Sequence, residues 1–135
     1  MDYCKGRVTK LLVDYFENDF RRINHALNVL KEAENLLKEY NSFNYEIIIA
    51  TALLHDVGIK RSEEELGYNN GKTQERYGPS IAKELLLSIN FPRDKIKTVT
   101  DIIGNHHSPS KYEYVELEIL KRADNIVNRE ENIVL

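Results

Sequence analysis

The sequence has a single cysteine, no tryptophan and no long apolar run. Cys4 alone cannot form a disulfide within the chain, which is typical of a protein from a reducing compartment. The longest apolar run, residues 47–54, is far shorter than the ~20 residues that a membrane-spanning helix needs. Asp2 and the absence of an apolar stretch behind it argue against a secretory signal. We therefore expect a cytoplasmic protein that does not act at a membrane.

The size and charge of the chain set further bounds. Its 135 residues, of which 41% are hydrophobic and 30% charged, predict one folded domain over residues 1–135. The 19 basic residues do not balance the 22 acidic ones, and the net charge is −3. Such a balance argues against a nucleic-acid polymer as a partner, because polymer binding needs a broad basic surface.

Apolar residues recur at the three- and four-residue spacing of amphipathic helices. This spacing predicts helices over residues 8–16, 20–37, 45–57, 79–88, 93–105 and 115–127. The helix over 45–57 is apolar almost all round, so we expect it to be the buried central helix. Asn18 or Asp19 can cap the helix that begins at Phe20.

Two further features complete the predicted fold. Residues 58–78 are polar, and we interpret them as a loop that covers a site, with Pro79 as the first residue of the next helix. No segment shows the alternation of a strand. The fold class is therefore all-α, a single bundle of about six helices.

Several histidines and aspartates lie where the apolar pattern predicts burial. His55 and Asp56 end the most apolar helix, and Asp124 lies on the apolar face of the last helix. Burying such groups is costly unless they are paired or bind a metal. His25 and the pair His106-His107 also fall on or at the ends of predicted helices. The residues alone leave open that each histidine is merely hydrogen-bonded or exposed and that the aspartates cap helices.

Four short segments resemble the HD-domain metal-dependent phosphohydrolase superfamily. They are Arg22–His25, Ala52–Gly58, Ile103–His107 and Leu120–Asp124, and they carry a His, a His-Asp pair, a double His and an Asp in that order. The resemblance covers roughly residues 20–130. It implies an all-α bundle of the HD-domain type.

The resemblance also implies a metal site and an activity. The metal ligands would be His25, His55, Asp56 and Asp124. Two imidazoles and two carboxylates suit one divalent transition metal, Mn, Fe, Co, Ni or Zn, better than Mg. The implied reaction is hydrolysis of a nucleotide or another small phosphate ester, in which a metal-activated water attacks phosphorus. Asp56 would also orient that water.

One departure from the family pattern bears on the number of metals. Relatives with two metals carry a further His before the fourth helix, whereas residues 74–79 contain none. A second metal is therefore disfavoured. His106 and His107 are then expected to bind substrate phosphate, with His106 also a candidate general acid for the leaving group. The alternative for His107 is a ring that faces solvent or caps the helix.

Phosphate binding also needs cations. Arg22 precedes His25 by three residues and would share its helix face, and the resemblance marks this position as a phosphate contact. Lys60 follows the His-Asp pair, and we expect it to bind phosphate and to belong, with Asp56 and His106, to the catalytic residues. The predicted loop also carries Arg76, a weaker phosphate candidate, and Glu75, a candidate water-activating base. Each cation has the alternative of a solvated surface charge.

Two other functions remain open at this point. The first is a metal-containing nucleotide-binding or regulatory module without turnover. The second is a structural helical protein whose His and Asp residues only satisfy one another. An oligomer is also open, because Tyr112 and Tyr114 form a strip that would suit an interface.

Overall fold

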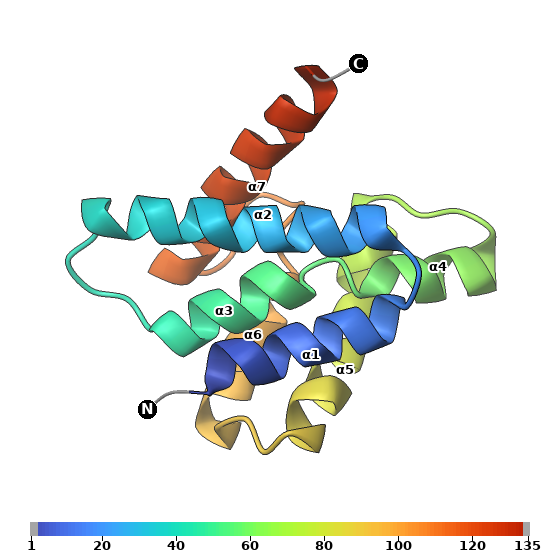
Figure 1. The fold of residues 1–135 in the computed structure, drawn as a ribbon, viewed down its shortest axis with the longest axis horizontal. Helices are drawn as coiled ribbons and strands as arrows, with labels where there is room; N and C mark the ends of the chain where they lie inside the picture. The colour runs from blue at the N-terminus through green and yellow to red at the C-terminus, as the bar shows by residue number, and fades with distance from the viewer. Residues whose placement is uncertain (1–2, 134–135) are drawn as a thin grey trace.

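The structure is a computed structural model, and it describes residues 3–133. These residues form seven α-helices and one 3-10 helix, and they contain no strand (Figure 1). The helices are α1 (Cys4–Phe16), α2 (Phe20–Leu36), η1 (Leu37–Glu39), α3 (Tyr45–Leu54), α4 (Gly58–Leu66), α5 (Gly71–Ser88), α6 (Arg93–Ile103) and α7 (Val115–Ile133). The prediction of an all-α bundle is therefore confirmed.

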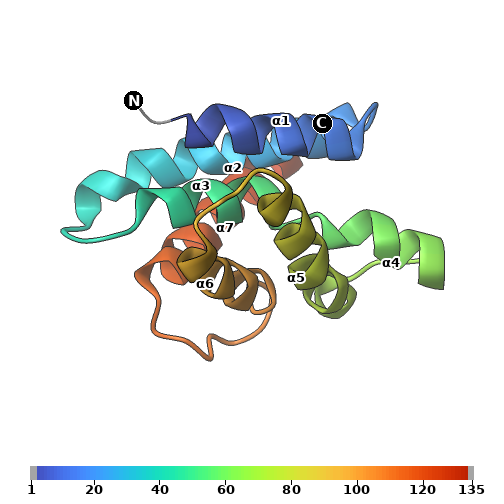
Figure 2. The ribbon, with the colours of Figure 1, turned by 90° about the horizontal axis from the view of Figure 1, so that it is seen from below.

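Helix α3 is the centre of the bundle. Every residue from Ile47 to Leu54 is buried, as the all-round apolar pattern predicts. Asn44 caps the start of the helix, because its side chain accepts a hydrogen bond from the amide of Ile47. Figure 2 shows α3 between α1 and α2 on one side and α6 on the other, and it contacts all three. The residues that follow α3 are consequently fixed in the interior.

The caps and crossings of the outer helices place the remaining site residues. Of the two candidate caps for α2, the structure uses Asp19, whose side chain accepts from the amide of Arg22. Helix α7 packs against α2 more extensively than any other pair of helices packs (Figure 1). This crossing brings residues of the second and the last helix together.

Residues 58–78 are not a loop, so this part of the prediction was wrong. They form α4 and the first two turns of α5, and only residues 67–70 connect the two helices. Gly67 ends α4 in the left-handed conformation, with φ 78°, and a capping box between Asn70 and Thr73 starts α5. Pro79 consequently lies inside α5 rather than at its first position.

The backbones of α4 and α5 approach each other closely at Gly58. A Cβ atom there would lie 2.6 Å from the carbonyl oxygen of Gln74 and 2.7 Å from the amide nitrogen of Gly78. Both neighbours are backbone atoms, so a rotation of a side chain could not make room for the added Cβ atom. Glycine at position 58 is therefore a packing requirement of this helix pair.

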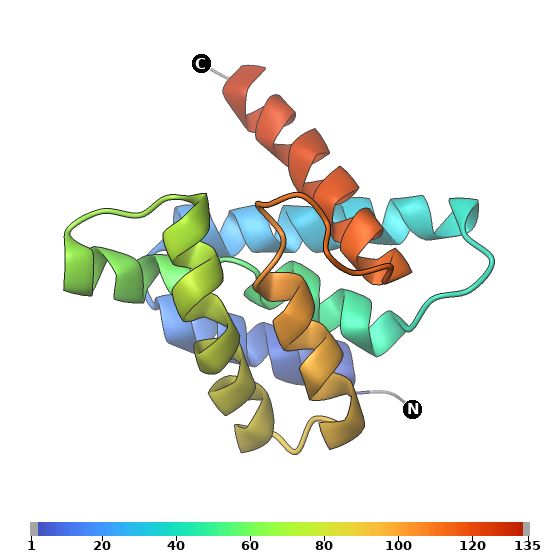
Figure 3. The same cartoon turned by 180° about the vertical axis from the view of Figure 1, so that it is seen from behind.

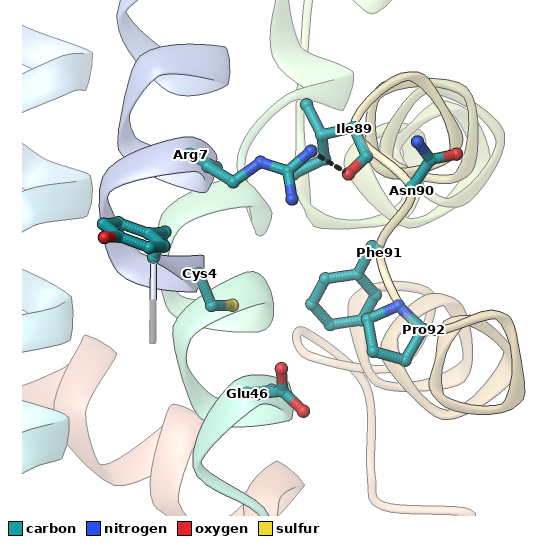
Figure 4. A pocket seen from close by; sticks show the side chains of 8 residues that line it. Cys4, Arg7, Glu46, Ile89, Asn90, Phe91 and Pro92 are labelled. Atoms are coloured by element: carbon teal, nitrogen blue, oxygen red, sulfur yellow. Dashed lines mark hydrogen bonds between the residues drawn. The ribbon is translucent and has the colours of Figure 1, made fainter. Parts of the chain in front are cut away.

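Figure 4 shows a cavity of about 320 Å³. It is lined by Glu46 in the first turn of α3, whereas the His-Asp pair follows the last turn of that helix. Cys4, Arg7, Glu46 and Phe91 are among its lining residues, and the Arg7 guanidinium donates to the carbonyl oxygen of Ile89. None of the four histidines lines it. Within residues 3–133, no helix has the length and apolar content needed to cross a membrane.

The close approach at Gly58 predicts a stability effect. We expect Gly58→Ala to lower the free energy of unfolding by about 1–3 kcal/mol, because the added methyl group forces α4 and α5 apart. Gly6→Ala is the matched control, since nothing lies within 4 Å of a Cβ atom at that position of α1. This change should stabilise the helix by about 0.5–1 kcal/mol. Denaturant unfolding measures both, and a Gly58→Ala protein as stable as the wild type would contradict the packing argument.

Candidate metal centre

Two helices, α2 and α7, and the turn after α3 bring the predicted metal ligands together. The Nε2 atom of His25, on α2, lies 3.0 Å from Oδ1 of Asp124, on α7. The Nε2 atom of His55 lies 3.3 Å from Oδ2 of Asp56 and 3.4 Å from Oδ1 of Asp124. The four residues therefore converge as expected, and their role as ligands stays a prediction.

Two buried histidines of the cluster are oriented in the same way. The Nδ1 atom of His55 lies 2.8 Å from the carbonyl oxygen of Ala52, and that of His106 lies 2.6 Å from the carbonyl oxygen of Ile103. A carbonyl oxygen only accepts, so Nδ1–H must be the donor in both rings. The opposite Nε2 atoms are buried and make no hydrogen bond within the described part of the chain. In the neutral ring, each Nε2 therefore presents a free lone pair.

His25 has the same arrangement with a different acceptor. Its Nδ1 atom lies 3.0 Å from a carboxylate oxygen of Glu131, which holds Nδ1–H and leaves Nε2 to face Asp124. A neutral Nε2 and a carboxylate oxygen are both acceptors, so the 3.0 Å approach requires a cation or a proton between them. Glu131 escaped the sequence analysis, although it lies seven residues after Asp124 and hence on the same face of α7.

The electrostatics of the cluster favour a cation. Burial by itself would lower the pKa of His55, but the carboxylates of Asp56 and Asp124 outweigh it and raise that pKa to about 9. Burial would raise the pKa of Asp56, yet the imidazoles of His55, His106 and His25 lower it to about 2. The pKa of Asp124 is likewise held well below its usual range, against burial, by His25 and His55. Both carboxylates are therefore ionised at neutral pH.

These features fit a divalent metal ion. The carboxylates are anionic, and Nε2 of His55 points at them from a side chain with no solvent exposure. A pKa of about 9 places a proton on this atom when no metal is bound, and a metal ion can take the place of that proton. Nitrogen and oxygen donors in this ratio are those of transition-metal sites. The cluster of His25, His55 and Asp56, with Asp124 beside it, can consequently hold a metal ion.

A second group of possible ligands shares Asp56 with the first. His106, His107 and Asp56 offer atoms that lie within 4.8 Å of one another. His107 is exposed, as its alternative expected, and its Nε2 atom also lies 2.6 Å from Oε1 of Gln74 and donates to it. Gln74 lies in the segment where two-metal relatives carry a further His. The expectation of a single metal remains a prediction.

Glu75 and Arg76 have other partners than the cluster. The Glu75 carboxylate accepts from the amide of His107 at 2.9 Å and from the hydroxyl of Ser108 at 2.6 Å. It therefore ties α5 to the residues after α6, which does not fit the expected role of a water-activating base. The Arg76 guanidinium lies 5.2 Å from the ring centroid of Tyr77.

Lys60 does not join the site, contrary to expectation. Its Nζ atom lies 3.5 Å from the carbonyl oxygen of Tyr15 and 3.8 Å from a carboxylate oxygen of Glu17. The reason is that residue 60 belongs to α4, whose direction carries this side chain to the end of α1. Lys60 is consequently a surface cation, and a catalytic or phosphate-binding role does not fit its position.

Two cavities border the cluster, and each is lined by a positively charged side chain. The first, of about 160 Å³, is lined by Arg22 together with His25 and Asp56. The second, of about 270 Å³, is lined by Lys121 together with His106, His107 and Asp124. Asn128 lines both cavities, so they adjoin along α7.

Lys121 is a residue that the sequence analysis missed. Its Nζ atom donates to the carbonyl oxygen of Ser108 at 2.6 Å and to the hydroxyl of Ser110 at 2.7 Å, and no carboxylate within residues 3–133 pairs with it. The signal was present, because Lys121 precedes Asp124 by three residues as Arg22 precedes His25. The cluster therefore has a positive group on each side.

Comparison with known proteins identifies the family of the chain. The chain belongs to the HD domain family, whose sequence pattern it matches over residues 22–129. An uncharacterized protein of Clostridium beijerinckii is 31% identical over 116 residues, which are 82% of this chain and 69% of that protein. The crystal structure of a predicted HD superfamily hydrolase from an uncultured Thermotogales bacterium superposes with a TM-score of 0.68. The two are 20% identical, over 93% of this chain and 73% of the other.

The contact between His25 and Glu131 predicts an effect on metal affinity. We expect Glu131→Ala to weaken binding of Co²⁺ about 10–100-fold, because the carboxylate no longer holds Nδ1–H of His25. Glu130→Ala removes the neighbouring exposed carboxylate and should leave the affinity unchanged. Calorimetric titration of chelator-treated protein measures affinity and stoichiometry, and we expect about one ion per chain. Equal affinities would contradict the orienting role of Glu131, and two ions per chain would contradict the single-metal expectation.

Proposed function

We propose that the protein is a metal-dependent phosphohydrolase that acts on a nucleotide or another small phosphate ester. The observation that carries this proposal is the buried Nε2 of His55, which makes no hydrogen bond within the described residues and lies 3.3 Å and 3.4 Å from two ionised carboxylates. Cations in the two adjoining cavities, Arg22 and Lys121, supply the charge that a phosphate needs. The fold shared with a predicted HD superfamily hydrolase adds support by analogy.

The proposed cofactor is one divalent transition metal, Mn, Fe, Co, Ni or Zn. Its ligands would be His25, His55, Asp56 and Asp124. A metal in such a site lowers the pKa of water and polarises a phosphoryl group. Hydrogen bonds orient two of these ligands, because the carbonyl oxygen of Ala52 fixes the imidazole of His55 and the Glu131 carboxylate fixes that of His25.

The protein's own groups have separate roles in the proposed reaction. Asp56 is ionised, since its pKa is lowered to about 2, and its carboxylate orients the attacking water. His106 keeps one proton on Nδ1 for the Ile103 carbonyl, so any proton that it gives to the leaving oxygen must come from Nε2. Arg22 and Lys121 bind the phosphate oxygens from the two cavities. The roles of Asp56 and His106 are thus those expected from the sequence.

A second candidate is a module that binds metal and nucleotide without turnover. One observation favours this candidate. The residue that contacts His107 is Gln74 and not the further histidine that two-metal relatives carry in this segment, so a metal ligand of those relatives is missing here. A purely structural role for the cluster is disfavoured, because a structural network would pair the Nε2 atoms of His55 and His106.

The proposal predicts a metal-dependent activity that needs Asp56. Protein stripped of metal and refilled with Mn²⁺, Co²⁺ or Ni²⁺ should release inorganic phosphate from nucleoside monophosphates or sugar phosphates. Asp56→Asn should lower kcat by about 10³-fold or more, because the neutral amide neither orients water nor ligates as a carboxylate does. Circular dichroism checks the fold of the variant. Nucleotide binding without product over the whole panel would favour the second candidate, and full activity of Asp56→Asn would refute the mechanism.

The positions of Lys121 and Lys60 predict opposite results for the same substitution. Lys121→Met should lower kcat/KM for every phosphate monoester by about 10–100-fold, because the phosphate loses a charged hydrogen bond. Lys60→Met is the matched control and should leave kcat/KM within about twofold, since Lys60 contacts α1. Steady-state kinetics on both variants checks this pair. A loss with Lys60→Met instead would restore the role expected from the sequence.

A further inference from the structure

Helix α7 carries a polar stripe along one face. Lys121, Asp124, Asn125, Asn128 and Glu131 recur at steps of three and four residues, so they lie on one side of the helix. Buried apolar residues of α7, among them Leu120, Ala123 and Val127, pack into the core. The polar stripe therefore runs along the metal centre and continues past it.

A third cavity follows the two that border the metal centre. It has a volume of about 430 Å³ and shares Lys121 and Asn125 with the cavity of His106 and Asp124. It lies between α7 and the connection from α6 to α7, which Figure 3 shows curling beside the start of α7. We call it the tyrosine cavity, because Tyr112 and Tyr114 line it.

The two tyrosines form a fixed aromatic wall. Their ring centroids are 5.3 Å apart and their planes differ by 18°, so the rings stack. The hydroxyl of Tyr114 donates to the Asp101 carboxylate at 2.9 Å and anchors the inner ring to α6. Tyr112 remains 38% exposed. The wall is thus built before any ligand arrives, which lowers the entropy cost of binding.

We propose that the tyrosine cavity binds the base of a nucleotide whose phosphate lies at the metal centre. This inference rests on the proposed function and names its substrate class. Lys121 stands at the boundary of the two cavities with no acidic partner, in the position that a phosphate group between base and metal requires. The base lies against the Tyr112–Tyr114 pair, and the amide of Asn125 offers both a donor and an acceptor to it.

The chemistry of the wall separates a nucleotide from other phosphate esters. A sugar phosphate has no π-face and gains nothing from stacked tyrosines, whereas every nucleobase does. The cavity on the other side of the centre is smaller, about 160 Å³, and carries Arg21, Arg22 and Glu131. The aromatic ring among its lining residues is that of His25, an expected metal ligand, and it has no tyrosine pair. The base is therefore assigned to the tyrosine cavity and not to the cavity of Arg22.

The experiment compares two substrates in three variants. Adenosine 5′-monophosphate carries a base, and ribose 5-phosphate lacks one. Tyr112→Leu should raise KM for the nucleotide about tenfold, because stacking is lost, and leave KM for ribose 5-phosphate within about twofold. Tyr112→Phe keeps the ring and should behave as the wild type. Tyr68→Leu is the matched control, since Tyr68 is 54% exposed between α4 and α5 and lines none of the three cavities.

Calorimetric binding of adenosine 5′-monophosphate to the Mn²⁺-loaded protein distinguishes the two proposals. Binding that Tyr112→Leu weakens, without hydrolysis by the wild type, would support the base site and refute the phosphohydrolase. Hydrolysis of both esters with equal kcat/KM, unchanged by Tyr112→Leu, would refute the base site alone. A change of oligomeric state in Tyr112→Leu at unchanged nucleotide affinity would also refute it and make the tyrosines an interface between copies.

Discussion

The hydrogen bond from Nδ1 of His55 to the carbonyl oxygen of Ala52 is the constraint on which the site depends. It spans three residues at the end of the buried helix α3, so the ring has no freedom to turn. Nε2 must then face the carboxylates of Asp56 and Asp124. His106 repeats this device with Ile103 at the end of α6. Helix ends thus aim both buried rings at one point.

Much of the fold follows from the spacing of apolar residues, and the exception is instructive. Helix α3 and the ends of α2 and α6 are visible in the sequence, because burial of one face demands the helical period. Helix α4 is not, since residues 60–66 are mostly charged and only Gly58, Ile59 and Ser62 are buried. A backbone contact between glycines holds this helix, and such a contact leaves no apolar pattern. Because α4 was predicted to be a loop, Lys60 was wrongly predicted to lie in the site.

The site was predictable in its main members and not in their partners. The order of His25, His55-Asp56 and Asp124 resembles a known family, which no single spacing could have indicated. The spacing places Glu131 on the same face of α7 as Asp124, but it does not predict the contact of Glu131 with His25 or that of Gln74 with His107. Both contacts arise from the angles at which α7 and α5 cross other elements. Lys121 was within reach by the spacing that marked Arg22. Sequence spacing thus finds neighbours on one helix, whereas contacts between helices need the structure.

Helix α7 and the connection before it differ in how freely their sequences can change among relatives. One helix carries Asp124, Glu131 and Lys121, so under the proposed function a substitution that shifts α7 would disturb metal binding and phosphate binding together. Residues 108–114 wall the tyrosine cavity without supplying any of the four expected metal ligands. Substitutions in that short connection can reshape the cavity while α7 stays in place. Under the proposed function, a change of substrate would therefore need substitutions in residues 108–114 and none of the four expected metal ligands.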